Sequence, residues 1–327
     1  MPDDFGYLNA RIRARRSRLL PEAFFREALS LNSPELVRVL GESTYGPDLT
    51  EESVSGIDRA VMIHLSRTVG DLPRIASGKT REVVRLMLLR TDLADVKTIL
   101  RGKSLGWSAE EIMGHLGGGT VPQGLYRAMA EASDALSLAQ VLSLLDHPLA
   151  RVLREASRVS HEPRDLELSL DQVFYKEVLR LAEQLGHPFL VDFTRFEIDA
   201  LNLTAGVKVF AIGVVEAPDR FFVRGGRRVG LSLFRRLTGG EVDALRELSD
   251  TDFARVAEAR DLPALEKSLR CTLLAKAREG AKDVLGPGLA NDYIHRMEWE
   301  ASRIRLLARR AYYKLPSASV EQEIFCS

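Results

Sequence analysis

The chain has 327 residues, with 46 lysine and arginine side chains against 46 aspartate and glutamate side chains, so its formal net charge is zero. This balance argues against a nucleic-acid-binding protein or a basic membrane-surface protein, because both depend on a large excess of cations. Hydrophobic residues make up 45% of the chain, enough for a buried core. Charged residues interrupt every apolar stretch well short of the roughly eighteen residues that a membrane-spanning helix needs.

Apolar residues recur at i, i+3, i+4 and i+7 along most of the chain, which is typical of amphipathic helices. Strand-like alternation is nearly absent, so the sequence predicts an all-α protein. In chain order, helices are expected at 5–18, 21–31, 34–42, 55–69, 79–104, 108–115, 122–131, 137–157, 168–186, 188–213, 230–238, 240–248, 251–259, 263–283 and 288–314. Prolines near many of the starts support these boundaries, because a missing amide donor costs little there.

Three landmarks recur in the same order, about a hundred residues apart, which indicates an internal repeat. The first is an aromatic residue followed by arginine at a helix start, the second is an aliphatic residue followed by an acid, and the third is an acid in the middle of a long helix. The first set is Phe25-Arg26, Tyr126-Arg127 and Phe234-Arg235; the second is Ile57-Asp58, Leu170-Asp171 and Leu265-Glu266; the third is Asp92, Asp199 and Glu300. A glycine pair, Gly117-Gly118 or Gly225-Gly226, precedes the last two aromatic landmarks, and turn punctuation is its simplest interpretation.

The repeat predicts three similar helical domains with pseudo-threefold symmetry. We expect a first unit at 1–91, closed by the C-terminal helix at 299–327, a second at 92–198 and a third at 199–298. Arg11-Ile12-Arg13 near the start matches Arg303-Ile304-Arg305 near the end. The chain therefore begins and ends with versions of the same helix, so it can close into a ring-like body in place of an open solenoid with capped ends.

Few residues are arranged as chemical groups of an active site. Ser77-Gly78-Lys79-Thr80 resembles the end of a phosphate-binding loop, but Pro73 occupies the position of the required upstream glycine and no strand is predicted before it. The six histidines form no i, i+4 pair, so turn or surface positions are the default interpretation. The sequence therefore predicts no catalytic residues, no cofactor, no metal and no small-molecule substrate.

Two further sets of charged residues have a structural interpretation. The repeated acids suit three copies of a structural ion pair, because one active site does not need three copies. Five arginines lie between Arg11 and Arg18 and four between Arg303 and Arg310, which leaves two interpretations open besides an anion-binding patch. These helix faces either meet acidic groups on partners or neighbouring helices, or they are simply solvated. A symmetric helical body of this kind favours an assembly or coupling role.

Four stretches carry a resemblance that covers essentially the whole chain. They are YLNARIRARRSRLL (Tyr7 to Leu20), RTDLADVKTILRGKSLG (Arg90 to Gly106), FEIDALNL (Phe196 to Leu203) and EWEASRIRLLARRAYYKLP (Glu298 to Pro316). In these motifs the sequence resembles the C subunit of the prokaryotic V-type (A/V-type) ATPase, which is the relative of the eukaryotic d subunit.

The resemblance implies a funnel of three helical domains standing on the cytoplasmic end of the membrane rotor ring, at the face of the cell membrane. It further implies a non-catalytic central-stalk role, in which the funnel receives the shaft subunits D and F and couples ATP synthesis or hydrolysis to ion transport. The membrane would be reached only through the ring. From the repeated helix starts we expect Pro21, Pro122, Gln123 and Gly230 to contact a partner. The alternatives are a helical adaptor or scaffold of another cytoplasmic complex, or a nucleotide-binding enzyme that uses Lys79.

Overall fold

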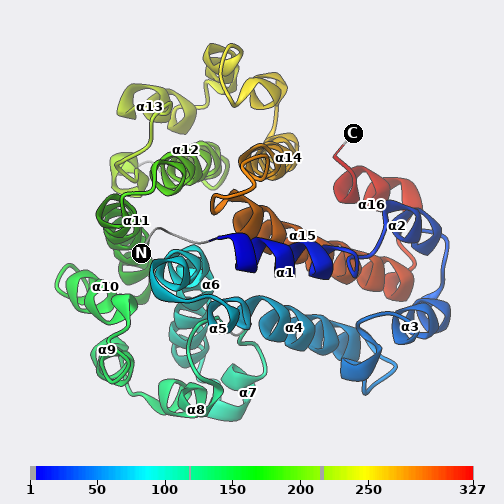
Figure 1. Ribbon diagram of the computed structural model, residues 1–327. Helices are drawn as coiled ribbons and strands as arrows, with labels where there is room; N and C mark the ends of the chain where they lie inside the picture. The colour runs from blue at the N-terminus through cyan, green and yellow to red at the C-terminus, as the bar shows by residue number, and fades with distance from the viewer. Residues whose placement is uncertain (1–4, 118, 214–216, 327) are drawn as a thin grey trace. The chain divides into compact units, whose positions relative to one another are not determined.

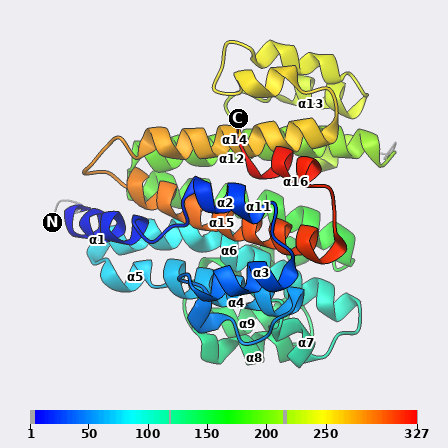
Figure 2. The ribbon, with the colours of Figure 1, turned by 90° about the vertical axis from the view of Figure 1, so that its right-hand side faces the viewer.

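The computed structural model describes residues 5–117, 119–213 and 217–326, and throughout these residues the regular structure is helical (Figures 1 and 2). The all-α prediction is confirmed. The α-helices are α1 (Gly6–Arg16), α2 (Glu22–Ala28), α3 (Ser33–Gly41), α4 (Val54–Gly70), α5 (Leu72–Ile75), α6 (Gly78–Ser104), α7 (Ala109–Met113), α8 (Gln123–Glu131), α9 (Ala135–Ser143), α10 (Pro148–Ser157), α11 (Pro163–Leu185), α12 (Pro188–Ala211), α13 (Leu231–Thr238), α14 (Leu262–Gly280), α15 (Gly288–Tyr313) and α16 (Ser317–Ile324). Four short 3-10 helices join them: η1 (Gly46–Asp48), η2 (Pro218–Phe221), η3 (Val242–Leu248) and η4 (Ala254–Glu258).

The chain divides into two compact units. Unit 1 comprises residues 1–98, 110–123 and 280–327, and unit 2 comprises residues 99–109 and 124–279. The long helix α6 begins in unit 1 and ends in unit 2. The finer division into three domains, at 1–91 with 299–327, 92–198 and 199–298, stays a prediction.

Unit 1 is built around α15, which packs against α4, α1, α3 and α16. Figure 1 shows the N-terminal helices in blue beside the orange and red helices of the C-terminal segment. The two ends of the chain share one hydrophobic core, in which Phe25 and Tyr45 lie with Ile304 and Leu307, each at most 1% exposed. Apolar side chains of the N-terminal segment are therefore buried against the C-terminal helix.

Unit 2 is a succession of neighbouring helices, in which α9 packs on α10, α10 on α11, α11 on α12 and α12 on α13. In the C-terminal part of unit 2, α12, α13, α14 and the 3-10 helices η3 and η4 share one hydrophobic core. There the rings of Phe196 and Phe253 stack with centroids 4.5 Å apart. Leu203 of α12 and Leu265 of α14 belong to the same core, and both are fully buried.

One predicted helix is wrong. The sequence predicts a single helix at 137–157, whereas the structure has α9 and α10 with a tight turn between them. Asp146 adopts a left-handed backbone, with φ 51°, and His147 is extended before Pro148. Proline restricts the residue before it to extended conformations and lacks the amide hydrogen that a continuing helix requires. His147 Nδ1 accepts the Leu149 amide instead, which caps the start of α10.

The segments predicted as helices at 240–248 and 251–259 also differ, because they contain the 3-10 helices η3 and η4. The short helices α5 and α16 were not predicted. α11 begins at Pro163, five residues before the predicted start at 168, consistent with the preference of proline for a first helical turn.

Candidate partner-binding site

The acid in the middle of α12 holds the backbone that leads into α13. Asp199 is 1% exposed, and its Oδ2 accepts the amides of Arg227 and Arg228, both at 2.9 Å. Its Oδ1 accepts the amide of Val229 at 2.8 Å. Hydrogen bonds to an ionised carboxylate are the strongest of the common types. One side chain therefore fixes three consecutive residues directly before the helix start at Gly230.

The other two repeated acids make the same kind of contact. Asp92 in α6 accepts the amide and the hydroxyl of Thr120, both at 2.7 Å, shortly before α8 begins. Glu300 in α15 accepts the amide of Leu20 at 2.7 Å, directly before α2, and the hydroxyl of Tyr45 at 2.8 Å. Both acids are at most 2% exposed. The sequence predicted ion pairs here; the described partners are backbone amides and hydroxyl groups.

The glycines before α8 and α13 have a steric reason to be glycine. A Cβ atom added at Gly119 would collide with the carboxylate of Asp92, and one added at Gly226 would collide with that of Asp199. The interpretation of the glycine pairs as turn punctuation misses this close approach. The third acid is Glu300, whose side chain is one methylene longer, and it reaches Leu20 in a segment without glycine. Aspartate beside a glycine, in two of the copies, and the longer glutamate without a glycine, in the third, thus each accept a backbone amide before a short helix.

A second contact recurs nine residues after each acid, where the sequence reasoning identified no functional residue. The base at that position forms an ion pair with an acid on another helix of the same unit. The pairs are Arg101 with Glu167 at 2.6 Å, Lys208 with Glu266 at 2.6 Å, and Arg309 with Asp58 at 3.0 Å. The last two acids belong to the predicted aliphatic-acid landmark. The constant nine-residue spacing between acid and base was the signal in the sequence that could have identified these pairs. Exposed pairs of this kind contribute at most about 1 kcal/mol each, so their effect is to fix helix register.

The aromatic landmark lies in the core. Phe25 and Phe234 are fully buried, and Tyr126 is 7% exposed. In unit 1 the guanidinium carbon of Arg303 lies 3.6 Å from the centroid of the Phe25 ring, and its Nη1 contacts Glu22 at 2.8 Å. The aromatic residue therefore anchors the short helix, while the acid fixes the chain before it.

The predicted partner-contact residues lie at the exposed starts of these short helices. Pro21 precedes α2, Pro122 precedes α8 and Gly230 precedes α13, and all three are exposed. Gln123 is the first residue of α8, and its side chain lies outside the described part of the structure. Among the described residues no side chain caps the start of α2 or of α13. At each of these three helix starts, a buried acid thus holds the preceding backbone, and the residue before the helix is exposed on the surface.

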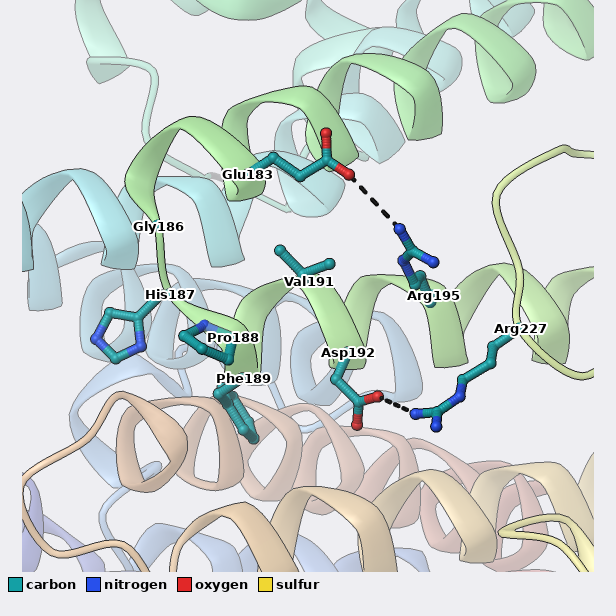
Figure 3. Close-up of a pocket in the computed structure, with 9 residues that line it drawn as sticks. All are labelled: Glu183, Gly186, His187, Pro188, Phe189, Val191, Asp192, Arg195 and Arg227. Carbon is teal, nitrogen blue, oxygen red and sulfur yellow. Dashed lines mark hydrogen bonds and ion pairs between the residues drawn. The ribbon is translucent and has the colours of Figure 1, made fainter.

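A groove with a volume of about 770 Å³ lies at the corner between α11 and α12 in unit 2 (Figure 3). Gly186 makes the corner with a left-handed backbone, with φ 68°. The charged side chains in the groove are paired, Glu183 with Arg195 at 3.6 Å and Asp192 with Arg227 at 3.0 Å. This arrangement is typical of a surface ion-pair network and not of a poised acid and base.

Neither the phosphate-loop motif nor the histidines form a reactive site in the described structure. Residues 72–75 before Gly78 form the helix α5, where a phosphate-binding loop would follow a strand. Lys79 lies in the first turn of α6. Across residues 5–117, 119–213 and 217–326, no group of three or more histidine, cysteine or acidic side chains is placed to hold a metal ion. In the same residues, no helix combines the length and the hydropathy that crossing a bilayer requires.

Comparison with known proteins decides the family. The family model described as ATP synthase (C/AC39) subunit matches residues 8–323. The chain belongs to this family. It is 45% identical to the V-type ATP synthase C subunit of Thermus thermophilus over 326 residues, which covers 100% of both chains. It is 30% identical to the V-type ATP synthase C subunit of Deinococcus radiodurans, covering 99% of this chain and 92% of the relative. The A-type ATP synthase C subunit of Haloferax volcanii is 25% identical over 97% of this chain and 96% of its own.

Membership in the ATP synthase (C/AC39) subunit family confirms the resemblance that the four sequence stretches indicated. The chain is accordingly a V-type ATPase subunit, and it has no catalytic function of its own. The contacts of Asp92, Asp199 and Glu300 are therefore understood as structural contacts within this subunit.

Proposed function

We propose that the chain is the central-stalk socket of a rotary V-type ATPase or ATP synthase. In this role it links the shaft, built from subunits D and F, to the membrane rotor ring, and it couples ATP synthesis or hydrolysis to ion transport. It stands at the cytoplasmic face of the cell membrane and touches the membrane only through the ring. The observation that carries the proposal is the full-length match to proteins named as the C subunit of V-type ATP synthase.

The repeated contacts support a body made of three similar helical units. A buried acid in each of α6, α12 and α15 holds the chain before a short helix, and a base nine residues later pairs with a neighbouring helix. A socket that passes torque needs positions that do not yield under load. Buried acids that accept several hydrogen bonds resist displacement better than exposed ion pairs.

The load can be estimated from the ion gradient. Moving one charge across about 100 mV is worth roughly 2.3 kcal/mol, so several charges per ATP place on the order of 10 kcal/mol on the joint. Contacts with shaft and ring together should then exceed a standard interface of roughly 1,600 Å². A helical body with wide surfaces suits this requirement.

The helix starts at Pro21, Pro122, Gln123 and Gly230 are the proposed contacts with the ring. The exposure of Pro21, Pro122 and Gly230 supports an external role, and the acids behind the three helix starts support a fixed position. Amides at a helix start attract carboxylates and polar loops. A negative charge introduced there should repel such a group while favouring the helix itself.

The coupling role is tested by reconstituting the soluble ATPase head with ring-containing membranes, with and without the chain. ATP-driven ion pumping should require the chain, and equal pumping without it would reject the role in favour of a helical scaffold of another complex. For the contact residues, Gln123→Glu and Gly230→Glu should weaken attachment to the ring. Gln322→Glu, on the exposed face of α16, makes the same change away from the proposed contacts and should leave attachment unchanged.

A further inference from the structure

The arginines in α1 and just after it differ in the groups that they contact. Arg15 pairs with Asp71 at 2.6 Å and donates to the Thr68 carbonyl, and Arg16 lies 3.7 Å from Asp292. Part of this run therefore meets neighbouring acids, as one of the two sequence interpretations expected. For the guanidinium of Arg18, no hydrogen bond or ion pair occurs within the described part of the chain.

Arg18 lines a cavity of about 370 Å³ inside unit 1, between the end of α1, the helix α4 and the middle of α15. Its polar lining consists of the guanidiniums of Arg15, Arg18 and Arg67, the hydroxyls of Thr44, Thr68 and Tyr293, the ring of His64, and the carboxyls of Asp71 and Glu300. Separate segments of the chain supply them. By the volume that a water molecule occupies in the liquid, about 30 Å³, the cavity has room for about a dozen waters or for a small polyatomic ion.

Asp48 and Asp71 hold two of the guanidiniums in place, and each guanidinium keeps N–H donors that these acids do not use. Asp48 accepts from both terminal nitrogens of Arg67, at 2.8 and 2.7 Å, and Asp71 accepts from one terminal nitrogen of Arg15. A guanidinium carries five N–H donors in a rigid plane, so each fork keeps donors that these acids do not use. Asp48 and Asp71 offset two of the positive charges, and Arg18 supplies a third.

The interior of the cavity offers neutral donors as well. Thr44 lines the cavity, and its hydroxyl oxygen has no hydrogen-bond partner among the described residues. Burial raises the pKa of the Tyr293 hydroxyl to about 12, so it stays protonated at neutral pH. Both oxygens of Glu300 are engaged by Tyr45 and Leu20.

We propose that this cavity binds a phosphate group, either as inorganic phosphate or as the terminal phosphate of a nucleotide. Arginine forks match the geometry of phosphate oxygens and bind them in pairs. Arg18 at the rim completes a cluster with Arg15 and Arg67, and the Thr44 hydroxyl supplies a donor from inside. The site goes beyond the socket role, because it is internal to unit 1 and distinct from the exposed helix starts.

The test is isothermal titration calorimetry on the purified full chain, at constant ionic strength in a buffer without phosphate, with inorganic phosphate and ADP as the two titrants. The wild type should bind at least one of them with a dissociation constant on the order of 1 mM or below. Tighter binding of ADP identifies a nucleotide as the source of the phosphate, and equal or tighter binding of phosphate identifies the free ion.

Arg18→Gln should weaken binding about tenfold, as the loss of a hydrogen bond to a charged group predicts. Thr44→Val keeps the side-chain volume and should weaken binding severalfold. Arg13→Gln removes the same charge from an exposed position of α1 that does not line the cavity, and it should leave binding unchanged. Circular dichroism checks that each variant is folded. The proposal is overturned if neither titrant binds the wild type, or if Arg13→Gln weakens binding as much as Arg18→Gln.

Discussion

The role of the buried acid in α12 makes a quantitative prediction for Asp199→Asn. An asparagine has one acceptor oxygen, so its amide group would face either the amide of Val229 or those of Arg227 and Arg228. In the milder case one buried donor loses its partner, at about 1–3 kcal/mol, and two bonds lose their charge assistance, at about 1 kcal/mol each. The expected loss in free energy of unfolding is about 3–5 kcal/mol. Asp192→Asn is the matched control, because it makes the same change on a half-buried side chain of the same helix that pairs with Arg227 and Lys276, and it should cost about 1 kcal/mol.

The assay is urea unfolding followed by tryptophan fluorescence. Trp107 belongs to unit 2 and Trp299 to unit 1, so replacing Trp299 with phenylalanine leaves a reporter of the unit that contains Asp199. Both aspartate variants are made in this background. A cost for Asp199→Asn within about 1 kcal/mol of that for Asp192→Asn would refute the view that the carboxylate holds the chain before α13.

Three further predictions concern individual contacts. Burial raises the pKa of the Glu300 carboxyl from 4.5 to about 7, so between these values the folded state holds a proton that the unfolded state has released, and stability falls as pH rises. In urea unfolding, the stability of the wild type relative to Glu300→Gln should therefore be about 3 kcal/mol higher at pH 4.5 than at pH 8, and a constant difference would contradict the raised pKa. Gly226→Ala should destabilise the protein by about 2–4 kcal/mol in thermal unfolding, whereas Gly230→Ala, where a Cβ meets open space, should change it by less than about 1 kcal/mol. Arg303→Lys keeps the charge but loses the planar contact with Phe25, so we expect the free energy of unfolding to fall by about 1–2 kcal/mol. In thermal unfolding this would lower the melting temperature, and an unchanged melting temperature would contradict the prediction.

The long helices could be predicted from the sequence because their apolar periodicity is a local signal. The predicted helices at 79–104, 188–213 and 288–314 lie within two residues of α6, α12 and α15 at both ends. The break between α9 and α10 was missed although Pro148 marked it, because an apolar pattern on both sides can continue in register through a turn. The segments of η3 and η4 were predicted as α-helices and not as 3-10 helices, because their apolar residues follow the same pattern as in an α-helix.

The contacts between distant segments were only partly predictable. The positions of Asp92, Asp199 and Glu300 followed from their recurrence, but their partners did not, because a backbone amide leaves no mark in the sequence. The cavity beside Arg18 could not have been predicted at all. Its groups come from segments far apart in the chain, and only folding brings Thr44 and Tyr293 to the same place.

The shared core of the chain ends has a consequence for biosynthesis. Phe25 is translated well before Ile304 and Leu307, which cover it in the shared core. At about 5–20 residues per second, the early segment waits on the order of tens of seconds for its partner, with its apolar surface open to chaperones. Unit 2 ends at residue 279 and is complete before α15 is translated, so we expect nascent chains to acquire protease resistance in unit 2 before they acquire it in unit 1.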